Sequence, residues 1–451
     1  MPRPSGAAFV WYGIIFRMIA LIQNFLATQV WPQTFAWLWF LAPIWIPLIS
    51  AELAWHMWVR YVRFAWHSSR KSIVLEIKLP AETVKSPAAM EVVLNALIQT
   101  GGEGTSSERY WEGKTRPWAS LELVVIDGEI HFYIWCFEGQ RNTITAAIYA
   151  QYPDVAVYEV PDYTTEVSKN RDKYDVWACQ YEFVKPDPYP IKTYIDYGLS
   201  DDPDEEFKVD PLASLIEALG TVNKEDQVWF QFIARAHVGE KGLFGWKFPD
   251  NWKEQAKKEI QKIIDSASVE NEDGKLIPSQ AKMTTEKKDL IDSIARSIAK
   301  FPFDVGIRCI QAYPKGETGH IRRDLIKGAF RQFGSNNLNN IKPNDQDYSY
   351  WRQDPAFYFE PLRRFMTPRN KRLGEHLFRC YCLRSYFFYP YKHGPHAPWL
   401  AWGVKYHHRP IMVLNTEELA TLYHFPGSTA KAPALPRIPS KRSDAPPNLP
   451  I

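Results

Sequence analysis

The sequence contains few cysteines and lacks the residue patterns of the common catalytic sites. Its five cysteines are Cys136, Cys179, Cys309, Cys380 and Cys382. An odd and scattered set forms no disulfide framework, which fits a reducing cytoplasm better than an extracellular setting. No paired carboxylates, no Ser-His-Asp arrangement and no Cys-His arrangement stand out. We therefore expect no catalytic residue and no enzymatic activity.

A nucleotide-binding loop is also missing. The tripeptide Gly113-Lys114-Thr115 ends like a phosphate-binding loop, but such a loop needs a glycine five residues before Gly113. Glu108 occupies that position. We interpret these residues as a surface loop, and we expect no cofactor.

Charge is absent from a long stretch near the N-terminus, between Met18 and Ala51. A membrane-spanning helix needs about 20 mostly apolar residues, and the stretch over about 34–59 meets that length. Tryptophan favours membrane interfaces. We predict a transmembrane helix over about 34–59, and the tryptophans assigned to this anchor are Trp37, Trp39, Trp45, Trp55 and Trp58.

Basic residues follow this apolar stretch and include Arg60 and Arg63. By the positive-inside rule they place the bulk of the chain in the cytoplasm, so we expect an inner-membrane protein in contact with lipid. An earlier apolar segment, about 7–27, carries Arg17 in its middle. We interpret it as an interfacial helix, and a first span that completes a hairpin is the alternative. Together, residues 1–71 form the predicted membrane anchor.

Residues 72–165 show the alternation and turn residues of a small α+β domain. Asp127-Gly128 separates two alternating runs, which predicts a β-hairpin. Strands are expected at 73–79, 120–126, 129–136 and 155–160, with helices at 86–99 and 141–152. This order is βαββαβ, the ferredoxin-like unit.

A second, enlarged α+β domain is expected at 174–335, with an acidic, disordered insert around 270–278. Its β-α-β-insert-α-β-α order fits a second copy of the first unit, although no repeat is visible at the level of single residues. Residues 336–425 form a basic and aromatic region of irregular pattern. Residues 426–451 are rich in proline, which predicts an extended linker or tail. The overall fold class is therefore α+β behind a membrane anchor.

Two alternatives arise from the C-terminal half. Basic and aromatic residues are combined there as in proteins that grip single-stranded nucleic acid. The basic residues with this role, or with a role in binding an acidic protein, are Arg363, Arg364, Arg369, Lys371, Arg372, Arg322 and Arg323. Cys380 and Cys382 with nearby histidines are the other alternative, a zinc site. Their one-residue gap differs from the usual two-residue gap, and we predict no metal site.

Several phrases together resemble a known protein family. They are Leu121-Glu-Leu-Val-Val-Ile-Asp-Gly-Glu-Ile-His-Phe-Tyr133, Ile148-Tyr-Ala-Gln-Tyr-Pro-Asp154, Lys192-Thr-Tyr-Ile-Asp-Tyr-Gly-Leu199 with Asp210-Pro-Leu, Leu414-Asn-Thr-Glu-Glu-Leu-Ala-Thr-Leu-Tyr-His-Phe-Pro426 and Pro446-Pro-Asn-Leu-Pro450. The chain resembles the membrane-anchored N-terminal region of bacterial HerA/VirB4-type DNA-translocase ATPases of type IV secretion and conjugation.

In those relatives the proline-rich phrase is followed by the nucleotide-binding motor, whereas this sequence ends at Ile451 without a Walker A loop. ATP hydrolysis and catalytic residues therefore do not transfer. The resemblance implies an adaptor that positions a HerA/VirB4-type ATPase or its DNA cargo. We also expect a homo-oligomer, because ring-forming motors favour symmetric assemblies. The alternative function is a membrane-tethered module that binds single-stranded nucleic acid.

Overall fold

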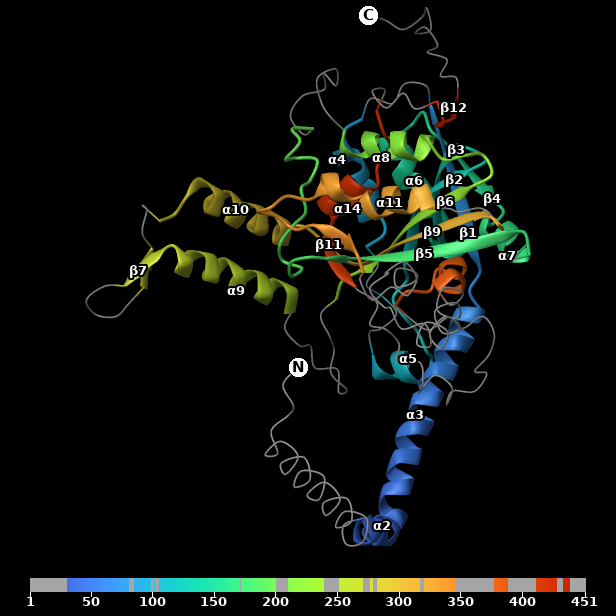
Figure 1. Ribbon diagram of the computed structural model, residues 1–451, viewed down its shortest axis with the longest axis vertical. Coiled ribbons are helices and arrows are strands. Elements are labelled where there is room, and N and C mark those ends of the chain that lie inside the picture. Colours follow the sequence, from blue (N-terminus) through green and yellow to red (C-terminus); the bar gives the residue numbers. More distant parts are fainter. Residues whose placement is uncertain are drawn as a thin grey trace, which may run out of the picture. The chain divides into compact units, whose positions relative to one another are not determined.

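The computed structural model describes residues 31–80, 85–98, 101, 105–170, 172–199, 210–238, 251–270, 276–278, 282–316, 320–344, 377–387, 411–427 and 433–438. Two compact units divide the chain between Val62 and Arg63. In the first unit, α2 (Trp31–Phe40) is followed by a turn at Leu41 and then by α3 (Ala42–Ser68), which continues past the boundary. The chain changes direction between these two helices (Figure 1).

The transmembrane helix predicted over about 34–59 is wrong. Among the described residues, no helix is both long and apolar enough to cross a membrane. The turn at Leu41 breaks the uncharged stretch, and the 10 residues of α2 reach only about 15 Å at 1.5 Å per residue. The uncharged part of α3 ends at Glu52. The interfacial helix expected at 7–27 lies outside the described residues.

The segment after α3 contains the expected strands and helices in the expected order. They are β1 (Ser72–Pro80), α4 (Pro87–Asn95), β2 (Ala119–Ile126), β3 (Glu129–Phe137), α6 (Arg141–Gln151) and β4 (Ala156–Val160). These strands pair antiparallel in the spatial order β4-β1-β3-β2. Asp127 and Gly128 both adopt positive φ, 53° and 80°, as a tight hairpin turn requires.

The following segment repeats this arrangement. Its elements are β5 (Tyr174–Phe183), α8 (Pro211–Gly220), β6 (Gln227–Ala236), β9 (Pro302–Pro314), α11 (His320–Gly328) and β10 (Ile341–Pro343). The spatial order β10-β5-β9-β6 matches β4-β1-β3-β2 when strands are counted along the chain. The helix starts match as well, because Asp210-Pro211 opens α8 as Ser86-Pro87 opens α4. Two copies of one topology therefore follow each other.

The two copies share one sheet. Strand β2 pairs antiparallel with β6 over seven residue pairs, from Ala119 with Ala234 to Val125 with Val228. With the short strands β11 (Met412–Asn415) and β12 (Arg437–Ile438), the sheet has ten strands. The predicted α+β content is confirmed, but the predicted modules are halves of one continuous sheet.

An insert separates β6 from β9. It consists of α9 (Asn251–Ser266), β7 (Ser268–Glu270), β8 (Leu276–Pro278) and α10 (Thr285–Ala299). The prediction of disorder around 270–278 is wrong for the described part, because β7 and β8 pair antiparallel. Figure 1 shows α9 and α10 side by side, and their apolar side chains, among them Ala256 and Ile294, form a small cluster of their own.

Helices cover one face of the sheet (Figure 1). Side chains of α4, α6, α8, α11 and α14 (Thr416–Leu422) pack on the inward residues of the strands in one large apolar core. The opposite face carries a second apolar cluster, built on Trp135 and Trp229 and covered by α7 (Thr164–Lys169) and residues 377–387. Alternate residues of each central strand therefore serve different cores. The shortest helical elements are α5 (Ser106–Tyr110), η2 (Glu138–Gln140) and η4 (Arg331–Phe333).

Part of the predicted proline-rich linker packs against the sheet. Leu435 is buried, and Ile130 donates its backbone N–H to the carbonyl of Ala434 at 2.7 Å. Strand β12 pairs in parallel with the end of β1. Proline is tolerated there because β12 is only two residues long and lies between prolines.

We predict that Gly306→Ala destabilises the protein by about 1–3 kcal/mol. A Cβ at Gly306 would lie 2.2 Å from Cε1 of Tyr386, whose buried ring covers β9. Urea unfolding measures the effect. The control is Gly139→Ala, where an added Cβ meets no atom within 4 Å. Equal unfolding free energies for the two variants would contradict the packing of residues 377–387 on β9.

Candidate functional site

Residues 411–427, here called the anchor segment, pass through the core. Every residue from Met412 to Gly427 is buried. Strand β11 pairs antiparallel with the start of β9, and Asn415 begins α14. The Asn415 side chain accepts the N–H of Glu418 at 2.8 Å, and the Glu418 carboxylate accepts the N–H of Asn415 at 2.9 Å. This reciprocal capping box fixes where the helix starts.

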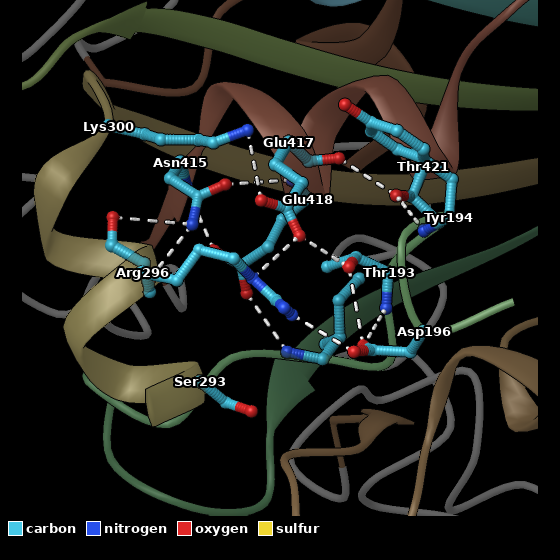
Figure 2. Close-up of polar contacts among 12 residues, drawn as sticks. Thr193, Tyr194, Asp196, Ser293, Arg296, Lys300, Asn415, Glu417, Glu418 and Thr421 are labelled. Atoms are coloured by element: carbon cyan, nitrogen blue, oxygen red, sulfur yellow. Dashed lines mark hydrogen bonds and ion pairs between the residues drawn. The ribbon is translucent and has the colours of Figure 1, made fainter. Parts of the chain in front are cut away.

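Glu417 brings a carboxylate into the interior, with a side chain that is 1% exposed. It accepts the hydroxyl of Thr193 at 2.5 Å and lies 3.0 Å from Lys300 Nζ and 3.4 Å from Arg296 Nε. Lys300 and Arg296 come from the end of α10, as Figure 2 shows. A buried carboxylate is tolerated when cations and hydrogen-bond donors surround it in this way.

Two further carboxylates hold these cations in place. Lys300 Nζ lies 2.8 Å from Glu91 of α4, and Arg296 Nη2 lies 2.9 Å from Asp196. Burial by itself lowers the pKa of Lys300, but Glu91 and Glu417 reverse this and raise it, so the ammonium stays charged. The network thus joins α4, α10, α14 and the loop after β5.

Glu418, the neighbour of Glu417, is fully buried on α14. Burial raises the pKa of its carboxyl to about 8, although the backbone N–H groups of Asn415 and Ile191 work against the shift. The Ile191 N–H lies 3.0 Å from its Oε1. Asp187, whose pKa burial raises to about 6, accepts a backbone hydrogen bond from Val413 of the same segment. The anchor segment is therefore held by two carboxyls that resist ionisation.

The end of the anchor segment contacts both halves of the sheet. Tyr423 donates its hydroxyl to the carbonyl of Tyr133 on β3 at 3.0 Å. His424 Nε2 lies 3.1 Å from the carboxylate of Asp210, which also caps α8. Burial lowers the pKa of His424, but Asp210 outweighs burial and raises it. The anchor segment thus ties β3 of the first half to α8 of the second.

A row of polar side chains crosses the opposite face of the sheet. Cross-strand register places its members next to one another, in the order Glu76, Tyr133, Glu122, Gln231, Arg308 and Gln180. At its centre the amide of Gln231 donates to Glu122 at 2.7 Å, and Arg308 Nε donates to Gln231 at 2.5 Å. The row therefore spans the joint between β2 and β6.

Arg384 closes this row from residues 377–387. It is fully buried and bonds both oxygens of Glu122, through Nε at 3.0 Å and Nη2 at 3.1 Å. Its Nη1 also bonds Asp162, and its backbone φ is 46°. Arg308 donates to the carbonyls of Ser385 and Cys380. Two arginines thus fasten residues 377–387 onto the sheet.

A third cluster centres on Asp304 of β9. Its carboxylate lies 2.8 Å from Arg235 Nε and 2.6 Å from His237 Nδ1. Burial raises the pKa of Asp304, but the contacts with His237 and Arg235 outweigh this and lower it. The carboxylates in all three clusters bind cations, hydroxyls or N–H groups of the protein itself. Chemically, these clusters stabilise the fold.

The predicted basic residues are only partly described. Arg363, Arg364, Arg369, Lys371 and Arg372 lie outside the described residues, and the structure describes only the backbone of Arg322 and Arg323, in α11. Arg60 and Arg63, which we assigned to the membrane anchor, lie on α3. The five tryptophans assigned to that membrane anchor, on α2 and α3, are between 38% and 82% exposed: Trp37, Trp39, Trp45, Trp55 and Trp58.

The zinc alternative concerned Cys380 and Cys382. Cys380 is buried beside Arg308, and burial raises the pKa of the Cys382 thiol to about 11. In the described ranges, no group of three or more His, Cys, Asp and Glu side chains is placed to hold a metal ion. The histidines of this alternative, His376, His393, His396, His407 and His408, lie outside those ranges.

Sequence reasoning missed the buried ion pairs. Glu417, Arg296 and Glu122 were not singled out, because their partners lie far away in the sequence. One local signal was present: Asn415 with Glu418 three residues later is a helix-start pattern inside a region that we expected to be irregular. Comparison of the sequence with protein-family models and with curated proteins finds no match.

We predict that stability falls as the pH rises from about 6.5 to about 8, above the range in which buried His67, whose pKa is lowered to about 3, acts in the opposite direction. A carboxyl whose pKa is higher in the folded than in the unfolded protein stabilises the fold fully at pH values below the unfolded pKa. This contribution is lost as the pH rises through the folded pKa, which is about 8 for Glu418. Asp187 and His424, with raised pKa values, act in the same direction. Carboxyls with lowered pKa values, such as Asp304, lose their contribution only in acid.

Urea unfolding across this pH range tests the prediction. One proton changes the free energy of unfolding by at most about 1.4 kcal/mol per pH unit. Glu418→Gln keeps a side chain that can cap a helix but cannot titrate, so it should flatten the slope above pH 6. An unchanged slope in this variant would contradict the assigned role of Glu418.

We predict that Arg384→Met destabilises the protein by about 3–5 kcal/mol, because it leaves the Glu122 carboxylate buried without its main counter-charge. The double variant Glu122→Leu, Arg384→Met should lose less than the sum of the two single variants. Lys71→Met is the control, since the Lys71–Glu138 pair is exposed to solvent and should contribute little to stability. Additive losses would show that the two charges do not interact.

Proposed function

We propose that this chain is a non-catalytic assembly subunit, an adaptor, in a DNA-translocation ATPase system of the HerA/VirB4 type. The observation that carries the proposal is the convergence of the family-like phrases on the anchor segment. Four of these phrases lie at 121–133, 148–154, 192–199 and 210–212, and a fifth, 414–426, is most of the anchor segment itself, whereas the phrase at 446–450 lies outside the described residues. In the fold the first five form one contact network.

Each phrase contributes a contact to the anchor segment. Tyr133 accepts the hydroxyl of Tyr423, and the ring of Tyr152 lies 4.9 Å from that of Phe425. Thr193 binds Glu417, and Asp210 pairs with His424. Because these phrases contact one another through the anchor segment, they belong to one folded region. This supports a resemblance of the whole folded region to the family, and not only of isolated stretches of sequence.

The position of the anchor segment supports an adaptor role. It joins both halves of the sheet, and the proline-rich stretch begins where it ends, at Pro426. Residues 433–438 of this stretch pack on the sheet, where β12 pairs with β1, and proline-rich sequence acts as a semi-rigid spacer. A motor bound beyond residue 438 would therefore pull on the sheet itself. We also propose that the adaptor assembles into a homo-oligomer that matches a ring-shaped motor.

The test is co-elution of the full chain with a HerA/VirB4-type ATPase from the same genome in size exclusion. We expect a stable complex, and no ATP turnover by the chain alone. Replacing residues 439–451 with a Gly-Ser stretch of equal length should weaken the complex and leave the urea unfolding of the chain unchanged.

Three results would contradict the adaptor. They are the absence of a complex with a folded chain, ATP turnover by the purified chain, and salt-dependent binding of single-stranded DNA without any binding of the motor. The last result would favour the nucleic-acid-binding alternative. It would be assigned to the basic region if the joint replacement of Arg363, Arg364, Arg369 and Arg372 by Glu abolished it.

A further inference from the structure

The helices α2 and α3 expose an unusual amount of apolar surface. Trp39 is 82% exposed, Phe40 72% and Leu48 66%, and the other large apolar residues from Trp37 to Ile49 are between 38% and 64% exposed. Soluble proteins seldom leave a contiguous apolar patch of this kind uncovered, and such patches mark sites of contact. The chemistry of the contacting partner follows from the distribution of these side chains.

Exposure runs all the way around the helix. Trp37, Leu38, Trp39 and Phe40 follow one another in α2, and each is at least 51% exposed. Successive residues of a helix point about 100° apart, so four in a row cover its full circumference. A groove on a protein covers one side of a helix, whereas lipid surrounds it. This geometry favours lipid over a protein partner.

Charge supports the same choice. No charged residue occurs from Trp31 to Ala51, so this stretch has no group with which to orient a protein partner through ion pairs. Tryptophan and other amphipathic aromatics concentrate where headgroups meet acyl chains. Along the sequence Arg60 and Arg63 follow, and such residues are attracted by anionic headgroups.

We propose that α2 and the first half of α3 bind a lipid surface by insertion into one leaflet, without crossing the bilayer. The turn at Leu41 divides the uncharged stretch into two short arms, and the 10 residues of α2 amount to about 15 Å, half the thickness of a bilayer core. The arms therefore fit within the apolar layer of one leaflet. This inference does not depend on the adaptor function.

Vesicle flotation of the full chain tests the proposal. Vesicles of phosphatidylcholine alone and with phosphatidylglycerol should both carry the chain upward, the second more strongly because of the anionic headgroups. Trp39→Asp with Ile44→Asp should lower vesicle binding at least about tenfold, because two carboxylates would enter the apolar layer. Trp111→Asp is the matched control, since Trp111 is 62% exposed and belongs to neither α2 nor α3, so the substitution should leave binding unchanged.

Two results would overturn the proposal. One is a folded chain, verified by urea unfolding, that fails to float with either vesicle. The other is equal flotation of the double variant and the control. If the double variant instead lowers the oligomeric state in lipid-free buffer while the parent chain ignores vesicles, a second copy of the chain is the occupant. Co-elution with the motor in lipid-free buffer is measured separately, so the two proposals fail independently.

Discussion

The structure depends on one constraint, the burial of the Glu417 carboxylate in the interior of a double α+β unit. A carboxylate at 1% exposure needs cations and donors around it, and Lys300, Arg296 and Thr193 supply them. These three residues belong to the insert and to the loop after β5, so satisfying one charge fixes several elements. The anchor segment is for this reason part of the core and not a strand laid on its surface.

A buried carboxylate also fixes a covering segment on the other face of the sheet. Glu122 lies on β2, beside the joint with β6, and Arg384 reaches it from residues 377–387. Two buried charge networks, one on each face, thus hold down the segments that cover the sheet. The pairing of β2 with β6 joins the two halves into one sheet, and the buried ion pairs fix which segments pack on its faces.

Much of the first half of the fold followed from local sequence. Alternation in 120–126 and 129–136 with Asp127-Gly128 between them is sufficient for a hairpin, and Ser86-Pro87 is sufficient for a helix start. The joint between β2 and β6 was not predictable, because both strands are buried on two faces and carry no mark of their neighbour. The ion pairs of Glu417 were not predictable either, because its partners lie far away in the sequence. The membrane span failed because apolar length was read without the break at Leu41.

Native-state hydrogen exchange tests the central claim, that the anchor segment is integral to the core. The amides of Leu419 and Tyr423 are hydrogen-bonded within α14 and at its end. We predict that they exchange only through global unfolding, with the same free energy of opening as the amides of Phe230 and Ile307 in the central strands. Exchange of Leu419 and Tyr423 through a local opening of much lower free energy, while the central strands stay protected, would contradict the account.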